Sequence, residues 1–588
     1  MHNIGGITNP DKLVEKKVNY FLDKLVEFTL YAGTQKLLEI ESPPSLVGKI
    51  IFQIECNTAH KIGYLDYYFS NIFFLKKDYW TKYEAFNEVI KSVEAYRLLG
   101  KGKKDEKCVI VENREFIIQL KELEAKLKAN MVDDLIFAVC NNSLCDHELY
   151  DPIPDGIGNH AESFAAAATM LGSEFLFRGY GLSEIDDIIG NVFSRDINKF
   201  PFSPDIETES DKRTFMKTRS LRQQLMGFAN VFKVEPSTGI AFIRVYGGIF
   251  PDDFVFKYNK VRFLGKSHPD ILELAKKDKD SDWYNFFSDD NFILAETSVT
   301  WVSKQSLFRT MLHIIQNELG FLSAKLGRIL VADNSNNILV LNNDRSFLGK
   351  HWALQDYGSK FEWRLIEDLK DNAFEALRNC DGAAKTWFLG FEHLFVEAHK
   401  DRSVADYWIY LEILLSGNER NGKRVREIFS SLLILTERKT SKKRVLIRLM
   451  NFLNSNETLT LVSTERRREV QKELLNGIIP LEFINVDYPY IKELMTEFNS
   501  ELTVKDYVKA REYYNGIALE TYEYRNFAMH SGVSHRAANI KLINTLSSLV
   551  VRFRQSIFEA IHKKGSEISF QELIEELVKK GEAMTKQE

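Results

Sequence analysis

Most of the strand-like sequence of this chain lies in one stretch, between about residues 200 and 345. The segment NVFKVEPSTGIAFIRVYGGIFPDDFVFKYNKVRFLG alternates short β-branched and aromatic runs with Pro-Ser-Thr-Gly and Pro-Asp-Asp turns. Further on, RILVADNSNNILVLNN has two apolar runs joined by Asn-Ser-Asn-Asn, which predicts another hairpin. Helical periodicity prevails on both sides. The pattern predicts an α+β fold, in which a mixed α/β N-terminal region is followed by an all-α helical bundle.

Two helices are predicted toward the N-terminus. The segment from Asp11 to Leu30 places its apolar residues on one broad stripe, which consists of Leu13, Val14, Val18, Phe21, Leu22, Leu25, Val26 and Phe28. A second helical run covers about Glu115 to Val139. The charged segment from Lys101 to Lys107 predicts an exposed turn or loop.

Helical periodicity returns at about residue 359 and continues almost to the end. A polar break at Asp401 to Ser403 separates two helical runs, and Gly417 is the predicted C-cap of the second. At about 150 residues per domain, a chain of 588 residues has room for two to four domains. We divide it into a mainly helical region, a mixed region with most of the strands, a helical domain and a helical tail, which cover residues 1–200, 201–384, 385–565 and 566–588.

The cellular location is predicted from cysteine content and apolar run length. Five cysteines in 588 residues, with no secretory pattern at the start, favour a reducing compartment and argue against a disulfide framework. The sequence contains no run of about 18 apolar residues, so no membrane span is expected. We therefore expect a cytoplasmic protein without a membrane partner.

One segment concentrates positive charge, although the net charge of the chain is −5. Between Glu419 and Arg448 ten cations stand against three anions, a local excess of seven positive charges. Such an excess can hold a polyanion, because local potential steers ligands more than net charge does. Solvated helix faces are the alternative interpretation. The candidates for contacts with a nucleic-acid backbone are Arg424, Lys442, Lys443 and Arg444.

A charged and polar motif lies near the end of the last strong helical run, in ETYEYRNFAMHSGVSH. The helix is predicted to begin at Thr503, with a reciprocal cap from Asp506, and to stop at Ser531 and Gly532. His530 then falls in its final turn, one turn after Asn526 and on the same face. Arg525 lies about 140° around the helix from His530, so a neighbouring helix or a second subunit could complete the site.

These residue types permit the cleavage of RNA without a metal. A histidine can accept the proton of a ribose 2′-hydroxyl or give one to the leaving 5′-oxygen, because its unperturbed pKa lies near neutral pH. An arginine can hold the scissile phosphate by two hydrogen bonds and stabilise its growing charge. An asparagine can orient the histidine or the phosphate. The alternative is a structural pair, with Arg525 in a salt bridge and His530 favoured by the helix dipole.

The segment YRNFAMHSG resembles the Arg-Asn-x-x-x-His signature of HEPN ribonucleases, and DYWIYLEILLSG is similar to the tryptophan and Leu-Glu helix of their Apea-like branch. The resemblance covers about residues 385 to 565. It implies a helical bundle and a metal-independent endoribonuclease without a cofactor, whose composite site forms when two domains pair. It assigns Arg525, Asn526 and His530 to the catalytic motif and, more loosely, Glu412 to a supporting role.

The resemblance also implies a biological setting. The family is frequent among prokaryotic toxins and abortive-infection proteins, which stop growth by cutting RNA, with tRNA as one candidate substrate. Because the sequence contains one such motif, it predicts at least a homodimer with facing His530 residues. The N-terminal 380 residues are expected to be a sensing or inhibitory region that responds to a phage component or another signal.

Two other functions stay open from the sequence. The helical domain could be a non-catalytic module that dimerises and holds a nucleotide or a protein partner. A zinc-dependent nuclease could use Cys140, Cys145, His147 and His160, although their spacing differs from that of common zinc sites. Buried thiols beside a polar loop are the favoured interpretation of that cluster.

Overall fold

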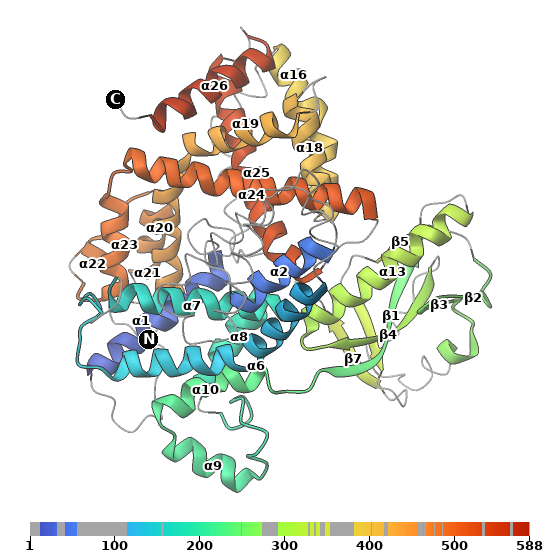
Figure 1. Cartoon of the computed structure of the whole chain (residues 1–588), viewed down its shortest axis with the longest axis horizontal. Helices are drawn as coiled ribbons and strands as arrows, with labels where there is room; N and C mark the ends of the chain where they lie inside the picture. Colours follow the sequence, from blue (N-terminus) through green and yellow to red (C-terminus); the bar gives the residue numbers. More distant parts are fainter. Residues whose placement is uncertain are drawn as a thin grey trace.

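The computed structural model describes nineteen stretches of the chain, namely residues 12–31, 42–55, 114–153, 158–194, 196–247, 250–272, 292–326, 330–333, 337–341, 347–352, 382–401, 403–416, 421–455, 462–463, 466–475, 477–484, 486–531, 536–564 and 568–586. Figure 1 shows three groups of elements: helices around α1 and α7, a sheet beside α13, and helices around α18, α19 and α26. The predicted α+β class, with a helical C-terminal region, is confirmed.

The first group consists of helices from the N-terminal region. Its members are α1 (Lys12–Tyr31), α2 (Pro43–Glu55), α6 (Arg114–Leu144), α7 (His160–Phe177), α8 (Leu182–Val192), α9 (Glu209–Thr218) and α10 (Leu221–Val231). Both helices predicted here are confirmed, and the predicted stripe of α1 buries Val18, Phe21, Leu22, Leu25 and Phe28. The predicted loop at Lys101 to Lys107 lies outside the described residues.

The helices α1 and α7 approach closely at Gly172. A Cβ atom at this position would lie 2.3 Å from Cδ1 of Phe28. Only glycine fits such a contact without displacing the aromatic ring. The two helices therefore pack directly against each other in the first group.

The second group is an antiparallel sheet with the strand order β2-β3-β4-β1-β6-β7, and β5 also pairs with β1. The strands are β1 (Ser237–Tyr246), β2 (Val255–Tyr258), β3 (Val261–Leu264), β4 (Ile293–Trp301), β5 (Val331–Ala332), β6 (Asn337–Leu341) and β7 (Phe347–Trp352). The helix α13 (Lys304–Leu326) buries Leu307, Met311 and Ile315 against alternate strand residues.

The prediction of a hairpin in RILVADNSNNILVLNN is wrong. Both apolar runs, β5 and β6, pair with β1 along the same edge, and their described residues do not pair with each other. Asp333 explains the path of the chain, because its backbone N–H donates to the Arg244 carbonyl at 2.8 Å and its carboxylate binds the Arg244 guanidinium at 2.6 Å. These contacts keep the chain at Asp333 next to β1, whereas a hairpin would reverse its direction and pair β5 with β6.

The third group contains most of the predicted C-terminal helices. Its members are α16 (Ala383–Gly390), α17 (Glu392–Asp401), α18 (Val404–Ser416), α19 (Gly422–Leu435), α24 (Val504–Ser531), α25 (Arg536–Lys564) and α26 (Phe570–Met584). They share one hydrophobic core, and α26 packs so closely on α19 that a Cβ at Gly581 would lie 2.3 Å from the Ser431 carbonyl oxygen. The predicted break between α17 and α18 is confirmed, whereas Gly417 lies outside the described residues.

The helices between α19 and α24 pack elsewhere. These are α20 (Glu437–Ser455), α21 (Arg467–Leu475), α22 (Leu481–Ile484) and α23 (Pro489–Asn499). Their apolar residues, among them Val445, Leu449, Ile491 and Leu494, belong to the core of the first group. The two helical cores are therefore interleaved along the chain, while the division at residues 200, 384 and 565 stays a prediction. Among the described helices, none combines the length and apolar character that crossing a membrane requires.

A buried acid lies where α1 meets the start of α23. The Tyr488 hydroxyl donates to Asp23 Oδ2 at 2.7 Å. Burial raises the pKa of Asp23 to about 7, against the opposing effect of this hydrogen bond. The folded protein therefore holds a proton on Asp23 in a pH range where the unfolded chain releases it.

Asp23→Asn is expected to change the pH dependence of stability. The folded pKa lies above the ordinary value of 3.8, so the contribution of Asp23 is fully present below that value and is lost as the pH rises toward 7. Asparagine mimics the protonated acid, so from pH 5 to 7 the variant should gain about 1 kcal/mol per pH unit over wild type. Urea denaturation measures this, and the exposed Asp133→Asn serves as control. If the free energies of unfolding of wild type and Asp23→Asn change with pH in the same way, this prediction is contradicted.

Candidate functional site

The helix α24 carries the Arg-Asn-x-x-x-His motif, and its ends lie where the sequence predicts them. The Thr503 N–H donates to Asp506 Oδ2 at 2.9 Å, and the Asp506 N–H donates to Thr503 Oγ1 at 3.3 Å. This reciprocal cap starts the helix, which ends at Ser531. The predicted position of His530 in the final turn is confirmed for its backbone. Its side chain lies outside the described part of the helix.

The structure brings Glu412 of α18 to Arg525 of α24. The Arg525 Nη2 atom lies 3.5 Å from Glu412 Oε2, and the two side chains are 25% and 12% exposed. Arg525 Nη1 also donates to Asn526 Oδ1 at 3.0 Å. Asn526 therefore contacts the arginine, and its expected role in orienting the histidine or the phosphate stays a prediction. The result is a half-buried guanidinium that contacts Glu412 and Asn526 and belongs to the residue five positions before His530.

Aromatic packing positions α18 and α19 against this part of α24. The fully buried Trp408 lies one turn before Glu412, and its ring is 5.3 Å from the ring of Tyr522. The same tyrosine is also close to α19, since a Cβ at Gly422 would lie 2.9 Å from its ring. Glycine therefore lets the first turn of α19 reach α24 just before Arg525.

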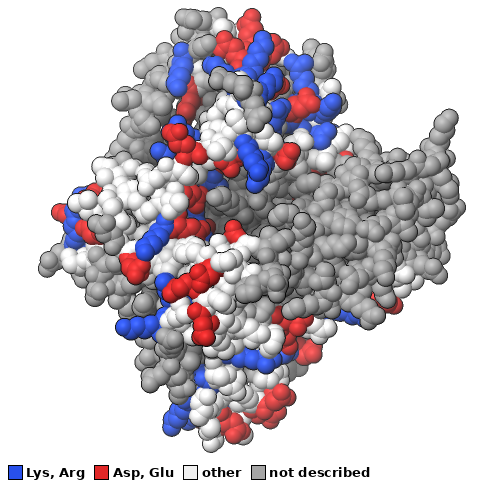
Figure 2. Space-filling model, turned by 60° about the vertical axis from the view of Figure 1, so that its left-hand side comes forward, with Lys and Arg blue, Asp and Glu red and all other residues white. Residues whose placement is uncertain are grey.

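The four basic candidates lie in different settings. Arg424 of α19 is 3.6 Å from Glu575 of α26, and the Lys442 ammonium lies 5.2 Å from the centre of the Phe498 ring. Lys443 is exposed. Arg444 is 7% exposed and binds Glu437 at 2.7 Å, so its charge is used inside the fold and we remove it from the RNA-binding candidates. Figure 2 shows Lys and Arg side chains interspersed with Asp and Glu over the described part of one face.

Only one of these candidates lies at the same end of α24 as the motif. Arg424 follows Gly422, which contacts Tyr522. In contrast, α20, which carries Lys442 and Lys443, begins beside Tyr514, because the Tyr514 hydroxyl donates to Glu437. Tyr514 lies about 16 Å along α24 from Arg525. A nucleic acid would therefore need to extend along α24 to reach both the motif and α20.

The cysteine and histidine cluster has partners of another kind. The rings of His147 and His160 stack at 5.5 Å, and His160 Nδ1 lies 3.0 Å from Asn142 Oδ1. The thiol of Cys145 donates to the Asn142 carbonyl at 3.1 Å. Burial lowers the pKa of His160 and raises that of Cys140. The described residues contain no group of three or more Cys, His, Asp or Glu that could hold a metal ion.

Sequence reasoning missed two clusters of buried charge on α20. Glu437 binds Arg444 and Arg552, and Arg448 binds Glu27 and Glu497. The sequence did contain one signal for these clusters, because the spacing of Glu437, Arg444 and Arg448 puts all three on one helix face. Their partners come from distant parts of the sequence and gave no local signal.

The chain was compared with protein-family models, with curated proteins and with solved structures. None of the three comparisons finds a match.

Proposed function

We propose that the protein is a metal-independent endoribonuclease of the HEPN type that acts in the prokaryotic cytoplasm as a toxin or abortive-infection effector against phage. The observation that carries the proposal is the ion pair of Arg525 with Glu412, made next to Asn526 and five residues before His530. It gives the arginine of the sequence motif a fixed, half-buried position. The N-terminal helices and sheet would sense the activating signal, which a phage component could supply.

In the proposed reaction, a histidine accepts the proton of a ribose 2′-hydroxyl, and that oxygen attacks the adjacent phosphorus. A histidine then gives a proton to the leaving 5′-oxygen, which leaves a 2′,3′-cyclic phosphate and a 5′-hydroxyl. In a homodimer the two roles fall to His530 of each subunit. Arg525 would bind the phosphate, because at 3.5 Å from Glu412 it forms an ion pair and keeps N–H donors for a second anion.

A non-catalytic binding or dimerisation module is the second candidate function. The contacts of Arg525 favour it, since an arginine held by Glu412 and Asn526 also serves to fix α18 against α24. In that case the same helices would hold a partner, and His530 would have no chemical role. The two functions differ in what they require of His530.

Cleavage of total RNA and tRNA in EDTA tests the proposal. The wild-type protein is expected to leave 2′,3′-cyclic or 3′-phosphate ends, and His530→Ala to cut at least about 100-fold more slowly, because a positioned acid or base contributes that much. His535→Ala removes a histidine five residues along the chain and should cut like wild type. The same variants are compared in phage-challenged cells, where an activator is present. If cells with the His530→Ala variant still stop growing and no RNA is cleaved, the protein acts as the binding module instead.

A further inference from the structure

The helix α20 carries a stripe of buried charge along one face. Glu437, Arg444 and Arg448 are seven and four residues apart, which places them within about 40° of each other around the helix. All three are less than a tenth exposed. Charged side chains are almost never buried to this degree unless they are paired. Each end of the stripe is therefore tied to another part of the fold.

The first cluster joins α20 to the helix that carries the motif. Glu437 accepts hydrogen bonds from Arg444 at 2.7 Å, from Arg552 of α25 at 2.6 Å and from the hydroxyl of Tyr514 of α24. The Arg552 guanidinium also lies 5.0 Å from the centre of the Tyr514 ring. One carboxylate thus holds α20, α24 and α25 together in a buried site.

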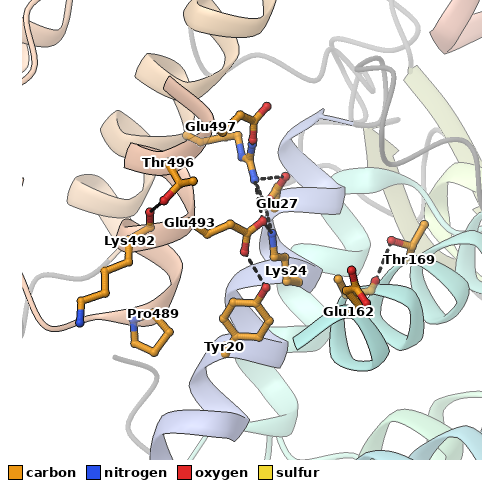
Figure 3. A network of polar contacts seen from close by, with 12 residues as sticks. Tyr20, Lys24, Glu27, Glu162, Thr169, Pro489, Lys492, Glu493, Thr496 and Glu497 are labelled. Carbon is orange, nitrogen blue, oxygen red and sulfur yellow. Dashed lines mark hydrogen bonds and ion pairs between the residues drawn. The ribbon is translucent and has the colours of Figure 1, made fainter. Parts of the chain in front are cut away.

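The second cluster joins α20 to the N-terminal helices. Arg448 binds Glu27 of α1 at 2.8 Å and Glu497 of α23 at 2.6 Å. Beside it, Glu493 accepts from Lys24 at 2.6 Å and from the Tyr20 hydroxyl at 2.5 Å. Figure 3 shows Tyr20, Lys24 and Glu27 of α1 facing Glu493 and Glu497 of α23.

Breaking a buried ionic cluster of this kind is costly, because the loss of one partner leaves the other charges buried and unpaired. Arg444 and Arg448 lie one helical turn apart, about 6 Å along a single rigid helix. A shift of α20 that breaks the Arg448 cluster therefore also moves Glu437 relative to Arg552 of α25 and Tyr514 of α24. Figure 1 shows α20 running between the helices around α1 and those around α24.

We propose that α20 couples α1 to α24, so that opening of the Arg448 cluster loosens the Glu437 cluster and the motif-bearing helix with it. The coupling joins the N-terminal helices to α24 whether or not the chain cuts RNA. An event that moves α1, such as the binding of a signal to the N-terminal region, would change the order of α24 without touching it.

Hydrogen exchange of the full chain, followed by mass spectrometry, tests the coupling. In Arg448→Met, peptides of α24 between residues 504 and 526 are expected to exchange about threefold faster or more, the lower end of the range for coupled residues. Arg438→Met is the matched control on the same helix, because Arg438 pairs with Glu501 on the exposed surface. It should leave α24 unchanged. Faster exchange confined to α1, α20 and α23 would overturn the proposal.

A second variant tests the coupling from the other end and does not require Arg448→Met to fold. Tyr514→Phe removes one hydroxyl from the Glu437 cluster and retains the ring. Coupling free energies are reciprocal, so exchange in α1, residues 12–31, should also rise about threefold or more. A response limited to α20, α24 and α25 would show two independent local clusters and overturn the proposal. No RNA is used, so the outcome is separate from that of the cleavage assay.

Discussion

Replacing Glu437 with glutamine is expected to lower the free energy of unfolding by about 3 to 5 kcal/mol. Glu437 is 6% exposed, and it compensates the charges of Arg444 and Arg552, whose side chains are also largely buried. Glutamine has nearly the same shape but no charge, so two guanidinium groups would remain buried without a counter-ion. Urea denaturation of the two proteins at pH 7 measures the loss.

The control for this change is Glu501→Gln. Glu501 pairs with Arg438 at 3.0 Å, and its side chain is 83% exposed. Exposed pairs contribute little, so this variant should lose less than about 0.5 kcal/mol. Equal losses in the two variants would mean that burial does not set the contribution of Glu437.

The pH dependence gives an independent check on the same residue. Burial alone would raise the pKa of Glu437, but Arg552 and Arg444 hold it below the usual value of 4.5. The stabilisation is therefore present above pH 4.5 and is lost as the pH falls through the lower folded pKa. In Glu437→Gln this part of the acid sensitivity should disappear, so the two stability profiles should converge at low pH.

Arg525→Ala is expected to slow RNA cleavage by about 100- to 1000-fold, the loss typical of removing one donor to a developing anion. Arg525→Lys keeps the charge but cannot bind a phosphate with two parallel N–H groups, so it should lose at least about tenfold. Glu412→Gln should have a smaller effect than Arg525→Ala, because Glu412 acts by positioning the guanidinium. Single-turnover cleavage of the RNA identified by end mapping measures all three.

Arg511→Ala is the matched control for these variants. Arg511 lies on the same helix and is 30% exposed beside Glu582, similar to the exposure of Arg525. Its loss should leave the cleavage rate within about twofold, as expected for a surface change. Full activity in Arg525→Ala would contradict the role of Arg525 as the phosphate ligand.

Periodicity and capping were sufficient to predict much of the fold. The amphipathic stripe of α1 and the reciprocal cap between Thr503 and Asp506 are local signals, and both are confirmed. The prediction of a hairpin between β5 and β6 was wrong because strand pairing depends on contacts that are distant in sequence. In this case Arg244 of β1 holds Asp333 and keeps the chain alongside.

The candidate site shows the same limit. Arg525, Asn526 and His530 could be named from the sequence because they share one helix. Glu412 was only a loose candidate, since its contact with Arg525 depends on how Trp408 packs on Tyr522. The contribution of Arg444 to a basic surface was misjudged because an excess of local charge does not reveal carboxylates supplied by other parts of the fold.

The interleaving of the two helical cores has a consequence for how the protein is made. Residues of α20 and α23, up to Leu494, complete the core that α1 and α7 begin. Domains generally fold from the N-terminus as the ribosome releases them, but here the core that α1 and α7 begin stays incomplete until α20 and α23 have been translated. A nascent chain in this state exposes surface that chaperones bind. Cutting the gene at residue 380 would yield an N-terminal fragment that lacks part of its core and a C-terminal fragment in which the apolar residues of α20 and α23 have lost their partners.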